Sequence, residues 1–324
     1  MTGKPHHQDT AGREPRASAE SGGGGGGGSG VYGNPHVAAG GGSGLVSRVL
    51  VGCCGWSYKE WVGPFYYSRH HMFRQYSEFF SVAEVDSTFY RVPPPAIFRA
   101  LSRLSPPGFR FLAKLPRSVT HEARCELTPH TRDALEQLLE SLEQLGPRLF
   151  CLLVQLPPSF TYEEGAVRLP PLLEHLESMV EGRGVRLAVE FRHPSWVEPA
   201  NLEQAKELLS TYGASWVVVD EPLLPPIRVE TSSLVYVRLH GRGSPTWYDY
   251  LYSDVELAEW AGRVRGFAED PGTGEVIIVF NNHPHGYAPR NALKFMEMLG
   301  IPIRGPPVLP RRVGQPSLDD YMRG

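Results

Sequence analysis

The 324-residue sequence has little that ties a chain to a membrane, to an oxidising compartment or to nucleic acid. It has no run of about 18 apolar residues, and its polar N-terminus lacks an apolar signal core. The four cysteines form no CxxC pair, as expected for reduced thiols. Lys and Arg number 32 against 35 Asp and Glu, a net charge of -3. We therefore expect a cytoplasmic protein without a membrane segment; only a basic patch assembled by the fold would favour nucleic acid.

Nucleotide-binding glycine motifs are also missing. No GxGxxG follows a predicted strand and no GxxxxGK[ST] occurs. Instead, 15 of the 35 glycines lie in residues 1–44, before the first regular pattern. We predict a disordered tail over residues 1–45, a single domain over 46–302 and a C-terminal extension over 303–324.

What is present is a regular alternation of strand-like and helix-like segments. Short runs rich in β-branched or aromatic residues predict eight strands, and most read as continuous apolar segments, which is typical of parallel strands covered on both faces. These runs are residues 48–53, 82–86, 109–114, 149–155, 185–191, 215–220, 234–240 and 275–281.

The segments between the strands have helical periodicity and helix-ending glycines. The predicted helices cover residues 71–80, 95–104, 131–145, 172–181, 200–212, 253–268 and 291–299. Gly146 is expected to cap one of them, and Ser253 with Glu256 has capping-box spacing. Eight strands alternating with helices predict a (β/α)₈ barrel of the TIM type.

The carboxyl ends of the predicted strands carry polar side chains, and active sites of such barrels gather at those ends. Alternation along a strand places three pairs on common faces: Glu84 with Asp86, Glu190 with Arg192, and Arg238 with His240. Buried charges of this kind cost several kcal/mol each unless they are paired or bind a ligand. The set therefore predicts either a lined pocket or an internal network of ion pairs, such as Glu190 with Arg238.

Several motifs around these residues form an ordered series along the chain. They are Gly52-Cys53-Cys54-Gly55-Trp56-Ser57-Tyr58 with Trp61, Glu84-Val85-Asp86-Ser87-Thr88-Phe89-Tyr90, Lys114-Leu115-Pro116, Glu190-Phe191-Arg192-His193-Pro194-Ser195-Trp196, Val237-Arg238-Leu239-His240-Gly241 and Asn281-Asn282. Over roughly residues 49–300 the sequence resembles the YecE-like family, also called domain of unknown function 72. The resemblance implies a TIM-like barrel and supplies no activity. Cys53-Cys54 replaces a Thr-Ser pair common in that family, and His283-Pro284-His285 stands where an acidic residue often follows the Asn pair.

The first chemical hypothesis is an enzyme for a small anionic or phosphorylated substrate. Arg192 and Arg238 have the two-point donor geometry that oxyanions accept, and Lys114 adds a positive charge. Glu190 and His240 would be the general base and the general acid of a hydrolysis, lyase or isomerisation reaction. Lys114 also allows Schiff-base chemistry if its pKa is lowered.

A divalent metal is the second hypothesis. Glu190, Asp220 and His240 end three successive predicted strands and offer suitable ligand atoms, as in metal-dependent hydrolase or endonuclease barrels. The three cations at the same ends argue against it, so the cofactor stays open.

Aromatic and amide side chains suggest a third hypothesis, a site for sugars or bases. Trp56, Tyr58 and Tyr90 could stack on sugars or bases, or simply pack loops. Asn281 and Asn282 could read hydroxyl groups or base edges. Glu84 with Glu190 would suit glycoside hydrolysis at a suitable separation.

Taken together, the sequence predicts catalytic roles for Glu190, His240, Asp220 and Lys114. The predicted ligand-binding residues are Arg192, Arg238, Glu84, Asp86, Tyr90, Trp56, Tyr58, Gln155, Asn281 and Asn282. The alternative is a binding module without catalysis that recognises nucleic acid or a partner protein. The oligomeric state is open.

Overall fold

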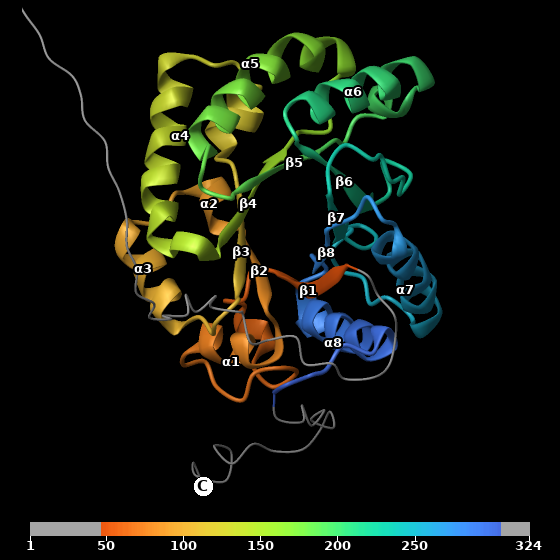
Figure 1. The fold of residues 1–324 in the computed structure, drawn as a ribbon. Coiled ribbons are helices and arrows are strands. Elements are labelled where there is room, and N and C mark those ends of the chain that lie inside the picture. The colour runs from red at the N-terminus through yellow and green to blue at the C-terminus, as the bar shows by residue number, and fades with distance from the viewer. Residues whose placement is uncertain (1–46, 306–324) are drawn as a thin grey trace, which may run out of the picture. The chain divides into compact units, whose positions relative to one another are not determined.

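Eight parallel strands close into a barrel in the computed structural model, which describes residues 47–305. The strands pair in chain order, and β8 closes the ring on β1 (Figure 1). They are β1 (Arg48–Cys54), β2 (Val82–Val85), β3 (Arg110–Lys114), β4 (Leu149–Gln155), β5 (Arg186–Glu190), β6 (Ser215–Asp220), β7 (Leu234–Leu239) and β8 (Glu275–Phe280). The predicted (β/α)₈ fold is confirmed, with each predicted strand within one residue of the observed one at either end.

Helices surround the ring of strands and cover its outer face (Figure 1). They are α1 (Met72–Phe79), α2 (Ser87–Tyr90), α3 (Pro95–Leu104), α4 (Pro129–Leu142), α5 (Tyr162–Val180), α6 (Pro199–Thr211), α7 (Asp254–Glu269) and α8 (Tyr287–Leu299). The Ser253–Glu256 capping box is present at the start of α7, where Ser253 Oγ accepts from the Glu256 N–H and Glu256 accepts from the Ser253 N–H. The apolar core lies between helices and strands.

Three helix predictions are wrong in detail. Helix α8 begins at Tyr287, four residues before the predicted position 291. Helix α5 begins ten residues before the predicted position 172, because Thr161 caps it and its leucine face is buried on both sides of Pro170 and Pro171. Burial of that face outweighs the cost of about 3 kcal/mol for proline inside a helix. Gly146 does not cap α4, which ends at Leu142; it lies instead in a following 3-10 turn, with φ of 56° and ψ of -135°.

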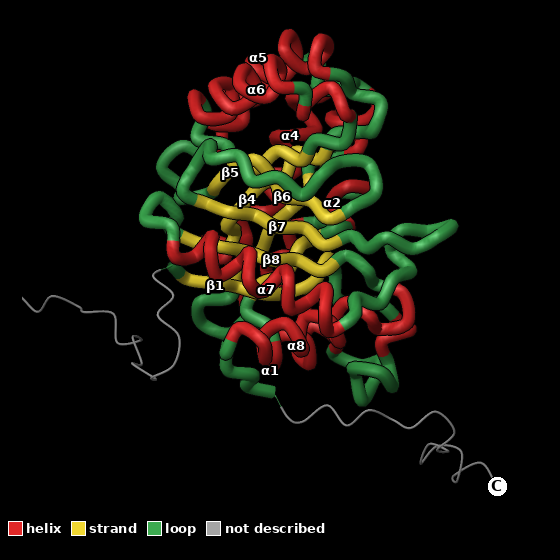
Figure 2. Tube along the Cα trace, turned by 90° about the vertical axis from the view of Figure 1, so that its right-hand side faces the viewer, coloured by secondary structure: helices red, strands yellow, loops and turns green. Residues whose placement is uncertain are grey.

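All strands run in the same direction, so their carboxyl ends share one end of the barrel (Figure 2). That end carries the strand-to-helix loops, including the long connection from β7 to α7. The predicted tail, 1–45, and most of the predicted extension, 303–324, lie outside the described residues. Among residues 47–305, no helix is long and apolar enough to cross a membrane.

Candidate functional site

Arg238 on β7 lies at the centre of a charged network inside the carboxyl end of the barrel. Its Nε and Nη2 donate to the two carboxylate oxygens of Glu84 on β2, at 2.9 and 2.7 Å. Its Nη1 donates to Gln155 Oε1 on β4 at 3.1 Å and to Glu190 Oε2 on β5. The Arg238 side chain is 0% exposed. The network anticipated as an alternative to a lined pocket is therefore present, and Arg238 is not free to hold a ligand in this structure.

Glu84 receives more donors than any single ion pair would supply. Besides Arg238, the Cys54 thiol donates to its Oε1 at 2.9 Å, and the Tyr236 hydroxyl donates to its Oε2. Burial alone would raise the pKa of Glu84, but the Arg238 and Lys114 cations lower that pKa to about 2. Glu84 is thus a fixed anion, which does not suit the proton donor of a glycosidase.

Lys114 at the end of β3 is paired in the same way. Its Nζ donates to Asp86 Oδ1 at 2.5 Å and lies 3.5 Å from Glu84 Oε1. Burial favours the neutral amine, yet Cys54, Glu84 and Asp86 raise the pKa of Lys114 above its ordinary value. A protonated lysine is not a nucleophile, so the geometry does not support Schiff-base chemistry.

Glu190 is held between two arginines. Arg192 Nε donates to Glu190 Oε1 at 2.7 Å, and Arg192 Nη2 lies 2.6 Å from the same oxygen. Arg238 donates to Glu190 Oε2. Burial opposes ionisation, but the Arg238 and Arg192 charges keep the pKa of Glu190 well below its usual range. This carboxylate is too stable as an anion to exchange protons near neutral pH. The predicted acid–base role of Glu190 is not supported by its surroundings.

His240 follows β7 and is buried beside Glu190. Its Nε2 lies 3.4 Å from Glu190 Oε2, and the side-chain nitrogen of Asn281 lies 2.9 Å from its Nδ1. Burial lowers the pKa of His240 to about 4 in spite of the Glu190 charge. The ring is therefore neutral. Donation from the Asn281 amide to Nδ1 places the proton on Nε2, which faces Glu190 Oε2 and also lies 3.3 Å from Arg238 Nη1.

Glu221, one residue beyond β6, is the unusual group of the site. Its side chain is 0% exposed, and neither carboxylate oxygen has a hydrogen-bond partner among the described residues. The nearest cation is Arg192, whose Nε lies 3.9 Å from Glu221 Oε2. Burial outweighs that cation and raises the pKa of Glu221 to about 7. This is the range in which a carboxyl group can both give and take a proton at neutral pH.

Asp220 does not join the network, contrary to our prediction. It pairs with Leu239 in the sheet register, on the face opposite to Arg238, and so points to the helix layer. There its oxygens accept from Trp260 Nε1 of α7 and from Arg242 Nε, both at 2.8 Å. The predicted metal ligands Glu190, Asp220 and His240 therefore do not face one point.

Other predicted ligand residues are also placed elsewhere by side-chain alternation or loop packing. Trp56 packs edge-on against Phe73 and Phe111 in the helix layer. Asn282 faces outward, and its side-chain amide donates hydrogen bonds to Tyr250 O and to Asn291 Oδ1. Tyr58 donates to Cys54 O at 3.0 Å, and Tyr90 is 73% exposed at the end of α2.

One trio of the described residues has metal-ligating atoms within 4.8 Å of one another: Cys54, Glu84 and Asp86. Its chemistry does not fit a cation. Glu84 already receives Arg238 and the Cys54 thiol, and Asp86 receives Lys114. Burial, followed by the Glu84 charge, raises the pKa of Cys54 well above its ordinary value, which disfavours the thiolate that a metal needs.

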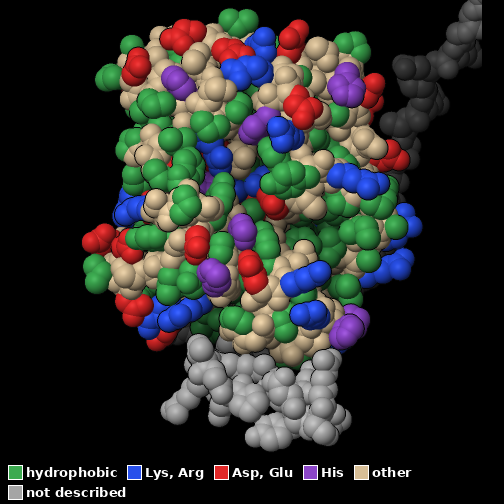
Figure 3. All heavy atoms as spheres, turned by 180° about the vertical axis from the view of Figure 1, so that it is seen from behind, with side chains coloured by type: hydrophobic (Ala, Val, Ile, Leu, Met, Phe, Trp, Pro, Cys, Tyr) green, Lys and Arg blue, Asp and Glu red, His purple; other side chains and the backbone are tan. Residues whose placement is uncertain are grey.

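Above the network, the carboxyl-end face is hollowed near its centre, and blue side chains of lysine and arginine are visible deep in the hollow (Figure 3). The connection after β7 contributes Tyr248, whose ring lies 6.0 Å from that of His240 and 5.9 Å from that of His283. Gly241 and Gly243 let this loop fold tightly, because a Cβ at either would lie 2.5 Å or less from a loop carbonyl oxygen. Arg192, Glu221, Tyr248 and Gln155 are neighbours of the network at this end of the barrel, and we call the region where they meet the mouth.

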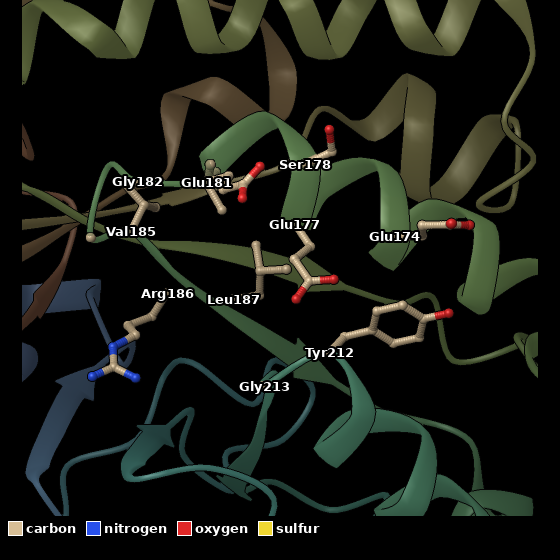
Figure 4. Close-up of a pocket in the computed structure, with 12 residues that line it drawn as sticks. Glu174, Glu177, Ser178, Glu181, Gly182, Val185, Arg186, Leu187, Tyr212 and Gly213 are labelled. Atoms are coloured by element: carbon tan, nitrogen blue, oxygen red, sulfur yellow. The ribbon is translucent and has the colours of Figure 1, made fainter. Parts of the chain in front are cut away.

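A separate pocket of about 650 Å³ opens at the other end of the barrel (Figure 4). It lies between the end of α5, the start of β5 and the turn before β6, and Glu174, Glu177 and Arg186 line it. Because it opens at the amino ends of the strands, it is distinct from the network around Arg238.

Fold and site define a TIM-like barrel with a charged carboxyl end. The chain belongs to the family described as protein of unknown function DUF72, whose family model matches residues 50–314. It is 24% identical over 277 residues to the UPF0759 protein YunF of Bacillus subtilis, covering 79% of this chain and 96% of that protein. A DUF72 family protein of Thermotoga maritima has 32% identity and a TM-score of 0.64, covering 78% and 99% of the two chains. One of Enterococcus faecalis has 22% identity and a TM-score of 0.65, covering 80% and 99%.

Sequence reasoning missed the contributions of Cys54, Tyr236 and Glu221. The signal for Glu221 was available: if Asp220 faces outward, the next residue faces inward by alternation. The sequence could not show which of the two neighbouring acids belongs to the barrel interior. The three predicted same-face pairs, in contrast, all lie together in the network.

Proposed function

We propose that the protein is an enzyme that acts on a small anionic substrate at the mouth by general acid–base catalysis. The observation that carries the proposal is Glu221, a buried carboxyl group without a hydrogen-bond partner beside Arg192. A buried polar group in that state costs free energy unless something pairs with it, and such costs are typical of sites that receive a ligand. In this proposal Glu221 is the proton-exchanging group.

The network below the mouth supports such a site by fixing its charges. Arg192 contacts Glu190 through Nε and Nη2, and its Nη1 has no partner among the described residues. Gln155 accepts from Arg238 through Oε1, and its amide nitrogen has no partner within residues 47–305. These two groups would bind polar atoms of the substrate, while Glu190 positions Arg192 and Arg238. Preorganised donors of this kind need no rearrangement during a reaction.

Two alternatives receive less support. Acidic, basic and histidine side chains are interspersed on the carboxyl-end face rather than gathered by sign, which does not favour a nucleic-acid surface (Figure 3). The Cys54–Glu84–Asp86 trio is already neutralised by Arg238 and Lys114, which does not favour a metal-dependent hydrolase.

The test begins with a thermal-shift screen of sugar phosphates, sugar acids, hydroxy acids and amino acids. We expect at least one class to raise the melting temperature of the wild type and not that of Arg192→Gln. Turnover of each stabilising compound is then followed by NMR. Removing a general acid–base group typically lowers the rate by about 10² to 10⁴, so Glu221→Gln should retain binding and lose turnover to that extent.

Arg117→Gln is the matched control, because Arg117 is an exposed arginine paired with Glu122 at the same end of the barrel. It should behave as wild type in both assays. Equal turnover by Glu221→Gln and wild type would refute the proposed role, and a screen without any stabilising compound would refute the small-molecule site.

A further inference from the structure

The charges of the Arg238 network are balanced without Glu221. Three cations, Arg192, Arg238 and Lys114, face three carboxylates that they contact directly, namely Glu84, Asp86 and Glu190. Glu221 is a fourth carboxyl group with no cation of its own, since Arg192 donates to Glu190 and only approaches Glu221 at 3.9 Å. One negative charge in this place is therefore in excess.

Arg192 has room for one further anion. Its Nη1 is the guanidinium nitrogen without a partner among the described residues, and the Arg192 side chain is 8% exposed, so it reaches the mouth. An anion bound at Nη1 and an ionised Glu221 would be two negative charges sharing one arginine. Two like charges sharing a site favour protonation of the one that titrates more easily.

We infer that Arg192 and Glu221 form an exchange site, in which the carboxylate of a small organic acid binds Arg192 while Glu221 takes up one proton from solvent. The exchange replaces one negative charge with another, so the total charge beside the Arg238 network is unchanged. A phosphate ester would bring a second negative charge, so a carboxylate fits better. The inference rests on the proposed function, because it names the substrate group that the mouth takes.

The groups that act on the pair come from several elements of the carboxyl end. The charged groups acting on Glu221 are Arg192, Glu190 and Arg238, from the β5 and β7 sides of the mouth. Tyr248 and His121 face Arg192 from neighbouring loops. Burial lowers the pKa of His121 and of His240 to about 4, so both rings are neutral above pH 6. Glu221 is the carboxyl group whose pKa lies within the window.

The experiment measures binding of acetate and of sulfate by calorimetry between pH 6 and 8.5, at constant ionic strength in chloride. Neither probe titrates in that range. For the wild type we expect the acetate Kd to rise by up to tenfold per pH unit above pH 7, because binding then requires uptake of a proton. Glu221→Gln should bind acetate with a Kd independent of pH, Arg192→Gln should not bind it, and Arg117→Gln should match wild type.

A wild-type acetate Kd that does not change with pH would overturn the inference, as would absence of acetate binding. Sulfate binding tighter than acetate would overturn the assignment to a carboxylate. If Arg192→Gln fails to fold, the comparison of Glu221→Gln with wild type still decides. The proposed function fails separately: acetate binding could follow the expected pattern while no organic acid is turned over, or turnover could occur with pH-independent acetate binding.

Discussion

Arg238 and Glu84 form a two-point ion pair inside the barrel, with both side chains 0% exposed and both carboxylate oxygens engaged. The pair joins β7 to β2 across the interior, and Glu190 joins β5 to the same guanidinium. A buried charge of this kind is tolerated only because every partner is present, since loss of one leaves the others desolvated and unpaired.

Replacing Arg238 with methionine should therefore be severe. Arg238→Met leaves Glu84 and Glu190 buried without their shared partner, and we expect a loss of about 3–5 kcal/mol in the free energy of unfolding. Urea denaturation measures it. Adding Glu84→Gln neutralises one stranded carboxylate and should restore part of the loss. Arg99→Met, at an exposed arginine bonded to Gln144, is the control and should cost under about 0.5 kcal/mol. A loss for Arg238→Met as small as the control's would contradict this account.

His240 should stay neutral over most of the accessible pH range. Its folded pKa of about 4 lies below the ordinary 6.5, because burial disfavours the imidazolium. The unfolded chain thus binds more protons between pH 4 and 6.5, and this group's contribution to stability is lost as pH falls through that window. Nitrogen NMR of the ring should show an unprotonated Nδ1 and a protonated Nε2 from pH 6 to 8, with His240→Gln assigning the signal. An imidazolium at pH 6 would show that the Asn281 and Glu190 contacts are misread.

The alternation of strand-like and helix-like segments was enough to predict most of the fold. The positions of the eight strands could be predicted without tertiary information. The site was less accessible from sequence for a physical reason. Strand-end position predicts which residues gather at one end, but one residue of register decides whether a side chain enters the barrel or the helix layer. The side chains of Asp220 and Asn282 point to the helix layer, while those of Glu221 and Asn281 point into the barrel. Whether Arg238 binds a ligand or its neighbours depended on distances that only the folded chain supplies.

Glu221 should make the protein less stable as pH rises. Its folded pKa of about 7 exceeds the ordinary 4.5, so the folded state binds more protons between pH 4.5 and 7, and stability falls as pH rises through that window. The full shift corresponds to about 3 kcal/mol. Glu221→Gln should match wild type near pH 4.5 and exceed it by up to that amount at pH 8. Because His240 and Glu84 titrate equally in both proteins, the difference between their pH–stability curves isolates Glu221. A constant difference across pH 4.5 to 8 would mean that Glu221 has an ordinary pKa.

The loop that carries Tyr248 depends on Gly243, which offers a further test of the mouth. A Cβ at this position would lie 2.3 Å from Asp249 O and 2.4 Å from Thr246 O, both backbone atoms that cannot rotate away. Gly243→Ala should displace the loop and weaken acetate binding at least fivefold, with a loss of about 1–3 kcal/mol in stability. Gly262→Ala is the matched control, because Gly262 lies in α7 with nothing within 4 Å of its would-be Cβ. That change should leave binding unaltered and raise stability by about 0.5–1 kcal/mol, as alanine does within a helix. Unaltered acetate binding in Gly243→Ala would remove the β7–α7 loop from the mouth and leave the site to Arg192, Glu221 and Gln155.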